Sequence, residues 1–151
     1  MLSVVIAGLG LLSQQHDAPT EKTDVAVSAT SSVQPSASSD ENDSAVDQAF
    51  AHHARDVQVE GQGVVVKILR DDNEGSRHQK FLLRMQSGLT VLVAHNIDLA
   101  PRVAELRAGD RVEFNGEYEW SEKGGVVHWT HLDPAGRHVG GWLKHDGHTY
   151  Q

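Results

Sequence analysis

The sequence contains no cysteine among its 151 residues. Without thiols the chain cannot form a disulfide scaffold, a thiolate zinc site or an iron–sulfur centre, and it has no cysteine nucleophile. Basic residues are also scarce, since 13 Lys and Arg stand against 21 Asp and Glu. Proteins that bind DNA without sequence preference show a basic face or stripe. The charge balance therefore argues against non-specific DNA binding.

Long hydrophobic runs are absent as well. Residues 2–12 form an uncharged, mostly apolar run of eleven, whereas a helix needs about 20 apolar residues to cross a bilayer. We therefore expect no transmembrane span. The run has the length of a signal-peptide core, although no Lys or Arg precedes it and no small-residue cleavage site follows. We interpret residues 1–12 as a signal for export to the periplasm or the medium.

The next segment, residues 13–44, is rich in Ser, Ala, Thr and acidic residues. Residues 1–43 hold one base and six acids, so most of the net charge of −8 lies in this part of the chain. Large apolar side chains are too few to build a core, which predicts a disordered spacer. Residues 45–151 remain and have the size of one domain, which we expect to be a monomer.

The pattern of residues 45–151 is mainly β. A short amphipathic helix is expected over residues 45–54, and alternation with period two then predicts five strands. These strands cover residues 57–69, 78–85, 89–94, 111–120 and 126–131, with a short helix ending near Leu106 between the third and the fourth. Gly61 and Gly63 suggest a bend in the first strand.

This order is typical of a five-stranded OB-like barrel, with a small half-barrel or sandwich as the alternative fold. We expect the last twenty residues to form an irregular extension on the barrel. The predicted core consists of Val64, Val66, Phe81, Leu83, Val91, Val112, Phe114 and Trp129.

Several segments have a distinctive amino-acid sequence. They are AHNIDLAPR at 94–102, GEYEW at 116–120, GGVVHWTH at 124–131 and GWLKHDGHTYQ at 141–151. Over about residues 55–151 the chain resembles a family of small bacterial domains of unknown function that are typically exported in Gram-negative bacteria. The resemblance implies an OB-like barrel and an envelope location. It brings no activity and no catalytic residues.

Ten histidines are the one unusual count. A hairpin centred on Lys123–Gly124 would place Glu119 opposite His128, with Cβ atoms about 5 Å apart. Glu117 and Thr130 would share that outer face. One hypothesis is a metal site for zinc or another divalent ion, formed by His128 and Glu119 with support from His131 and His138. The alternative is a cross-strand charged pair with ordinary loop histidines.

A second candidate site lies along the groove that OB barrels use for oligonucleotides or oligosaccharides. His78 and Gln79 begin the second strand, His95 and Asn96 end the third, and Trp120 offers a ring for stacking. His95 and Asn96 have an alternative role as caps of the following helix.

For function, the fold and the lack of nucleophile motifs such as G-x-S-x-G favour an exported envelope binding module. Its ligand would be a small molecule, a glycan, a peptide or an envelope protein. The alternative is a metal-dependent hydrolase, for example a nuclease, with its site near the fourth and fifth strands.

Overall fold

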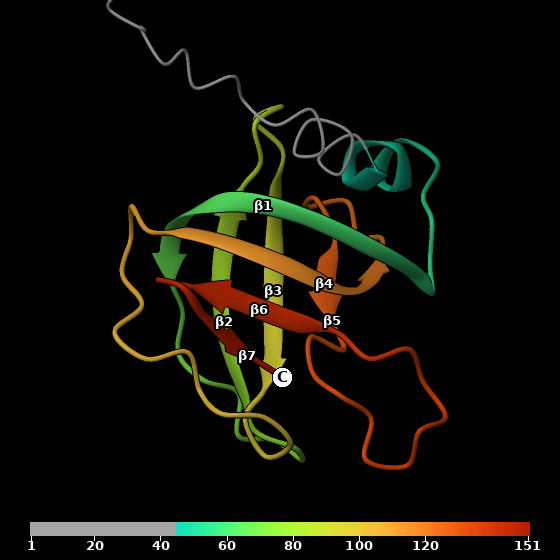
Figure 1. Cartoon of the computed structure of the whole chain (residues 1–151). Coiled ribbons are helices and arrows are strands. Elements are labelled where there is room, and N and C mark those ends of the chain that lie inside the picture. The colour runs from blue at the N-terminus through green and yellow to red at the C-terminus, as the bar shows by residue number, and fades with distance from the viewer. Residues whose placement is uncertain (1–44) are drawn as a thin grey trace, which may run out of the picture. The chain divides into compact units, whose positions relative to one another are not determined.

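The computed structural model describes residues 45–151 (Figure 1). The predicted export segment and spacer, residues 1–12 and 13–44, lie outside this range. The described chain begins with a helical segment over residues 45–51. Seven strands follow: β1 (Val57–Ile68), β2 (His78–Arg84), β3 (Thr90–Asn96), β4 (Arg111–Glu119), β5 (Val126–His128), β6 (Trp142–His145) and β7 (His148–Tyr150).

Five of these strands close into a barrel. Their order is β1-β2-β3-β5-β4, and β4 pairs back onto β1. The pairing of β3 with β5 is parallel, and the other pairs are antiparallel. This is the predicted mainly β, OB-like barrel, and it places the ends of β3, β4 and β5 close together.

Strand β1 closes the barrel because it pairs with two neighbours. Its residues 57–64 pair with β4 and its residues 64–68 with β2, with an irregularity between Val65 and Lys67. Figure 1 shows this strand curving along its length. A Cβ on Gly61 would lie 2.8 Å from the Phe114 ring, and one on Gly63 would lie 2.9 Å from the Arg84 carbonyl oxygen. Inward-facing glycines thus make room where the strand bends.

The core confirms most of the predicted buried set. Phe81, Leu83, Val91, Val112 and Phe114 are each fully buried. From the helical segment, Val46 and Ala49 also belong to this core.

Two valines of β1 were assigned to the wrong face. Val64 is 38% exposed and Val66 only half-buried, because the inward alternation of Gly61 and Gly63 continues to Val65 instead.

The predicted helix before Leu106 is absent, and within residues 45–151 only the segment 45–51 is helical. Two side chains hold the backbone between β3 and β4 in another path. The Gln79 side chain accepts from the Val103 backbone N–H and donates to the Val103 carbonyl. The ring of His95 bonds the Pro101 carbonyl oxygen. Backbone groups that a helix would use are therefore bonded to β2 and β3.

The C-terminal end differs from the irregular extension expected. Residues 129–141 do lack regular structure, but β6 and β7 then form a hairpin that joins the sheet at β4 (Figure 1). Leu143 of β6 lies opposite Phe114 and is fully buried. Two strands of four and three residues are too short to reveal their period in the sequence. Over residues 45–151, no helix is long and apolar enough to cross a membrane.

Candidate functional site

Two carboxylates and one imidazole meet on the outer face where β4 and β5 pair. Glu117 and Glu119 share this face because side chains alternate along a strand, and His128 lies directly opposite Glu117. One ligand atom from each of the three lies within 4.8 Å of the others. We call Glu117, Glu119 and His128 the His/Glu cluster.

The predicted register of this hairpin was wrong by two residues. His128 lies opposite Glu117 rather than Glu119. The turn is centred on Glu122 and Lys123, with the Gly124 N–H donating to the Ser121 carbonyl, and Gly124 and Gly125 after it both have a positive φ. A shift of two preserves the face of every side chain. The prediction therefore placed His128, Glu117 and Glu119 on the correct face but paired His128 with Glu119 instead of Glu117.

The Nε2 atom of His128 is buried and makes no hydrogen bond. It lies 3.3 Å from Glu117 Oε1. Within residues 45–151 it is one of two buried side-chain polar atoms that have no hydrogen-bond partner. Burial lowers the pKa of His128, against the opposing effect of Glu117 and Glu119. A neutral imidazole with a free lone pair is the form that binds a metal ion.

His138 reaches the cluster from the loop over residues 129–141. Its Nε2 lies 2.6 Å from Glu117 Oε2 and its Nδ1 lies 2.7 Å from the Val139 carbonyl oxygen. Both neighbours are acceptors, so both nitrogens donate and the ring is an imidazolium. The hydrogen bond to Glu117 raises the pKa of His138, in agreement with this assignment.

The loop that carries His138 is built around Asp133. Its carboxylate accepts the backbone N–H groups of Ala135, Arg137 and His138, which lowers the pKa of Asp133. The His138 ring also stacks on Trp129, with centroids 4.1 Å apart. The structure thus brings His138 beside the predicted pair.

His131 lies apart from the cluster. It is 3% exposed, its Nδ1 donates to the Leu132 carbonyl, and its ring contacts Trp129. Trp129 has a φ of 51°, which interrupts the alternation of β5. As a result Trp129 is half-buried instead of in the core. Thr130, expected on the outer face with His128, is fully buried.

Two of the five predicted ligand-binding residues are interior. Gln79 is bonded to the backbone of Val103, as described above. His95 is fully buried, with Nε2 donating to the Pro101 carbonyl and Nδ1 facing the Thr130 hydroxyl at 2.8 Å. Burial lowers the pKa of His95, so the ring is neutral and Thr130 donates to it. Their partners are protein groups, which favours a structural role.

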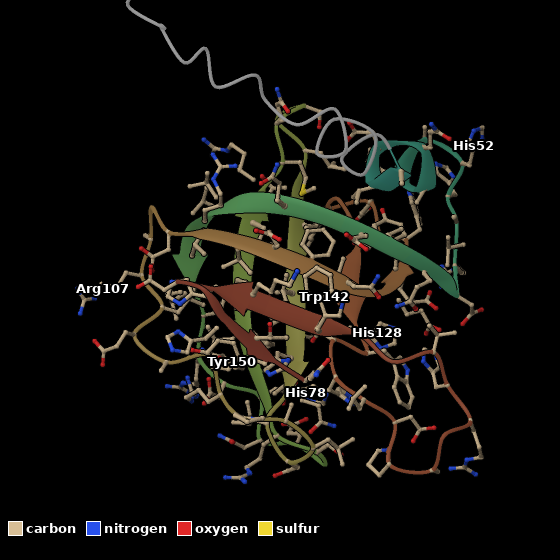
Figure 2. The ribbon with its side chains drawn as sticks, in the orientation of Figure 1. His52, His78, Arg107, His128, Trp142 and Tyr150 are labelled. Carbon is tan, nitrogen blue, oxygen red and sulfur yellow. The ribbon has the colours of Figure 1, made fainter. Side chains whose placement is uncertain are left out.

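His78 and Asn96 do lie together, in a surface depression of about 210 Å³. Its lining is Ser76, His78, Asn96, Leu99, His128, Trp129 and His131. Figure 2 shows His78 and His128 well away from His52. Trp120 lies elsewhere, with its ring centroid 4.2 Å from the ring centroid of His53. The predicted ligand-binding set is therefore divided among the interior, the depression and the neighbourhood of the helical segment.

A buried histidine at the C-terminal hairpin was not anticipated. His145 is 7% exposed, and its Nε2 bonds Asp110 Oδ2 at 3.0 Å. The same carboxylate accepts the Arg107 N–H, which lowers the pKa of Asp110. This contact attaches β6 to the start of β4. Nothing in the sequence links residues 110 and 145, so only the fold reveals the pair.

Comparison with known families adds one finding. The model of a family described as protein of unknown function (DUF3465) matches residues 25–151. The chain belongs to the DUF3465 family. The matched region includes the whole barrel, the His/Glu cluster and the depression. No curated protein matches the chain. Because the DUF3465 description assigns no activity, roles for these residues must come from their geometry.

Proposed function

We propose that this DUF3465 domain is an exported envelope module that binds a divalent transition-metal ion through Glu117, Glu119 and His128. One observation carries the proposal: three ligand atoms lie within 4.8 Å of one another, and one of them is a buried nitrogen without a hydrogen-bond partner. Imidazole and carboxylate donors without thiolate suit zinc, and also manganese or another divalent ion.

The alternative is a simple cross-strand ion pair. In such a pair His128 would be protonated and would donate to Glu117. His128 Nε2 does lie 3.3 Å from Glu117 Oε1. It makes no hydrogen bond there, and burial lowers the pKa of His128, which favours the neutral ring. An unpaired buried nitrogen costs about 1–3 kcal/mol, which coordination of a metal would recover.

The groups around the cluster also fit a metal site. Ligating carboxylates in proteins are usually oriented by hydrogen bonds from a second layer of residues. His138 donates to Glu117 Oε2, and Glu119 accepts the Asp56 N–H at 3.3 Å. Arg55 lies 3.4 Å from Glu119 through an exposed side chain. Residues outside the cluster thus orient the carboxylates of Glu117 and Glu119 through hydrogen bonds and an ion pair.

A zinc titration of chelator-treated full-length protein tests the proposal. We expect binding of one ion per chain, and a loss of at least about tenfold in affinity in Glu117→Gln and His128→Ala. Glu113→Gln is the matched control, because Glu113 lies on the same face of β4 but pairs with Lys144. Equal zinc affinity in all variants would overturn the metal site.

Export is a separate part of the proposal and rests on residues 1–12 and 13–44. Mass spectrometry of the protein recovered from the periplasm or medium should find an N-terminus beyond residue 12. A cytoplasmic protein that retains Met1 would remove the envelope assignment and leave the metal site untouched.

One observation favours a metal-dependent hydrolase as a second candidate. Three protein ligands leave coordination positions open for water, and His128 also lines the depression, where a substrate could lie. Hydrolysis of a phosphodiester or of single-stranded DNA by zinc- or manganese-loaded protein, lost in Glu119→Gln, would support it. Full metal occupancy without any hydrolysis would favour the binding module over the hydrolase.

A further inference from the structure

The depression beside the His/Glu cluster contains a hydrogen-bond acceptor on a buried side chain. His131 is 3% exposed and lines this depression. Its Nδ1 donates to the Leu132 carbonyl at 2.8 Å, so the lone pair of the neutral ring is on Nε2. Within residues 45–151, Nε2 has no hydrogen-bond partner. Because buried polar groups in native proteins are nearly always paired, we expect a ligand that donates a hydrogen bond to it.

A hydrogen-bond donor lines the same depression. The Asn96 Oδ1 accepts the Asp98 N–H at 2.9 Å, which leaves the NH₂ group of Asn96 for a ligand. Asn96 ends β3 opposite His78, the first residue of β2, whereas His131 follows β5. A ligand that uses both groups must therefore present a donor to one segment of the barrel and an acceptor to another.

The charges around the depression favour a neutral ligand. Among the described residues that line it, none is Lys, Arg, Asp or Glu. His128 does line it and lies 3.3 Å from the Glu117 carboxylate, whose charge disfavours an anion. Arg77 and Asp98, which are close in the sequence to the lining residues, are bonded to each other at 2.7 Å. A neutral group with both a donor and an acceptor therefore matches this environment best.

The size and the apolar part of the depression limit the ligand further. Its volume is about 210 Å³, several times the roughly 30 Å³ that one water occupies in the liquid. That space suits a small pendant group and excludes a polymer segment. Leu99, which is 46% exposed, and Trp129 supply apolar surface. An acetamido group has an N–H and a carbonyl oxygen on separate atoms, and a methyl group that such apolar surface can cover.

We propose that the depression binds the acetamido group of an N-acetylated amino sugar. The acetamido N–H donates to His131 Nε2, the acetamido oxygen accepts from the Asn96 NH₂, and the methyl group packs on Leu99 and Trp129. This inference goes beyond the metal site and does not depend on it, although His128 belongs to both the cluster and the lining of the depression.

The remaining polar residues of the lining favour a sugar over an acetylated lysine side chain, which carries the same pendant group. Ser76 is exposed and His78 half-buried, and both line the depression. Sugar hydroxyls donate and accept hydrogen bonds, so they suit a serine hydroxyl and an imidazole. The methylene groups of an acetylated lysine would leave both without a partner.

N-Acetylglucosamine is the probe, titrated into chelator-treated full-length protein and followed by heteronuclear NMR. We expect saturable shifts at the amides of Ser76, His78 and Asn96, and a shift of the His131 Nε2 signal that reports a new hydrogen bond. Glucose, which is neutral but lacks the acetamido group, should bind at least about tenfold more weakly. Nε-acetyl-lysine that binds as tightly as N-acetylglucosamine would overturn the assignment to a sugar.

Asn96→Asp is the sharpest variant, because it keeps an acceptor for the Asp98 N–H and replaces only the NH₂ donor. It should weaken N-acetylglucosamine binding by about tenfold or more, and so should His131→Phe, which removes the acceptor. If His131→Phe does not fold, Asn96→Asp decides alone. His148→Ala is the matched control, because His148 is an exposed histidine on β7 outside the depression, and it should leave the affinity unchanged.

Three results would refute the site: shifts that do not saturate, equal affinity for glucose, and unchanged affinity in Asn96→Asp. Because the protein is free of metal throughout this titration, none of these results counts for or against the zinc site.

Discussion

The buried His95 network and the His/Glu cluster differ in how completely the hydrogen bonds of their histidines are made. In the interior, His95 has a protein partner at each ring nitrogen. In the His/Glu cluster, His128 Nε2 has none. Buried polar groups in native proteins are nearly always paired, and an exception calls for an explanation. The comparison teaches that partner satisfaction, rather than residue type, separates a structural histidine from a candidate ligand.

The largest loss of stability should come from a substitution of His95, the histidine in the interior. His95→Ala removes a fully buried ring and leaves Thr130 and the Pro101 carbonyl without their partner. We expect a loss of about 3 kcal/mol of unfolding free energy, measured by urea denaturation. Zinc affinity of the folded protein should not change. A loss below about 0.5 kcal/mol would show that the His95 network is not structural.

The His/Glu cluster should respond in the opposite way. At a zinc concentration of 100 times Kd, binding adds about 2.7 kcal/mol to the stability of the parent. His128→Ala should remove at least about half of that gain, the result of a tenfold weaker affinity, while changing the metal-free stability by at most about 1 kcal/mol. Thermal melting with and without zinc measures both quantities. A zinc-dependent shift in His128→Ala as large as that of the parent would place the metal elsewhere.

His145 provides an intermediate case, since it is buried but bonded to a partly exposed carboxylate. His145→Ala should cost about 1–2 kcal/mol and should loosen the β6–β7 hairpin. Hydrogen exchange of the Leu143 and Lys144 amides will report this loosening. Unchanged exchange at these amides would mean that β6 is held mainly by Leu143.

The smallest effect is a pH dependence. Because burial lowers the pKa of His95 in the folded state, the unfolded chain takes up this proton first. The stability associated with the neutral ring is complete above the unfolded pKa of about 6.5 and declines as the pH falls toward the folded pKa. Unfolding measured across this range should show a shallower acid decline in His95→Gln than in the parent. Parallel curves would contradict the assignment.

The sequence was most informative where a short-range rule applied. Alternation along residues 111–120 put Glu117 and Glu119 on one face and Phe114 in the core, because the period of a strand is fixed by its geometry. The strand order also followed from pattern, and the closed barrel agrees with it.

What the sequence did not reveal depends on backbone conformation or on contacts across the fold. The positive φ of Gly124 and Gly125 changed the hairpin register, and that of Trp129 moved Thr130 to the interior. His138 reaches Glu117 only because Asp133 organises a loop without periodicity. For the same reason, the division of the predicted groove residues between interior and depression could not be read from their spacing.

The double pairing of β1 has a consequence for how fast the domain folds. Its second half pairs with β2, which follows closely in the chain, but its first half pairs with β4, where Val57 lies opposite Tyr118. Contacts between such distant residues are slow to form, because closing the loop costs entropy before any contact compensates for it. We therefore expect β1, β2 and β3 to assemble first, and the docking of β4 on β1 to limit the rate at which the barrel closes.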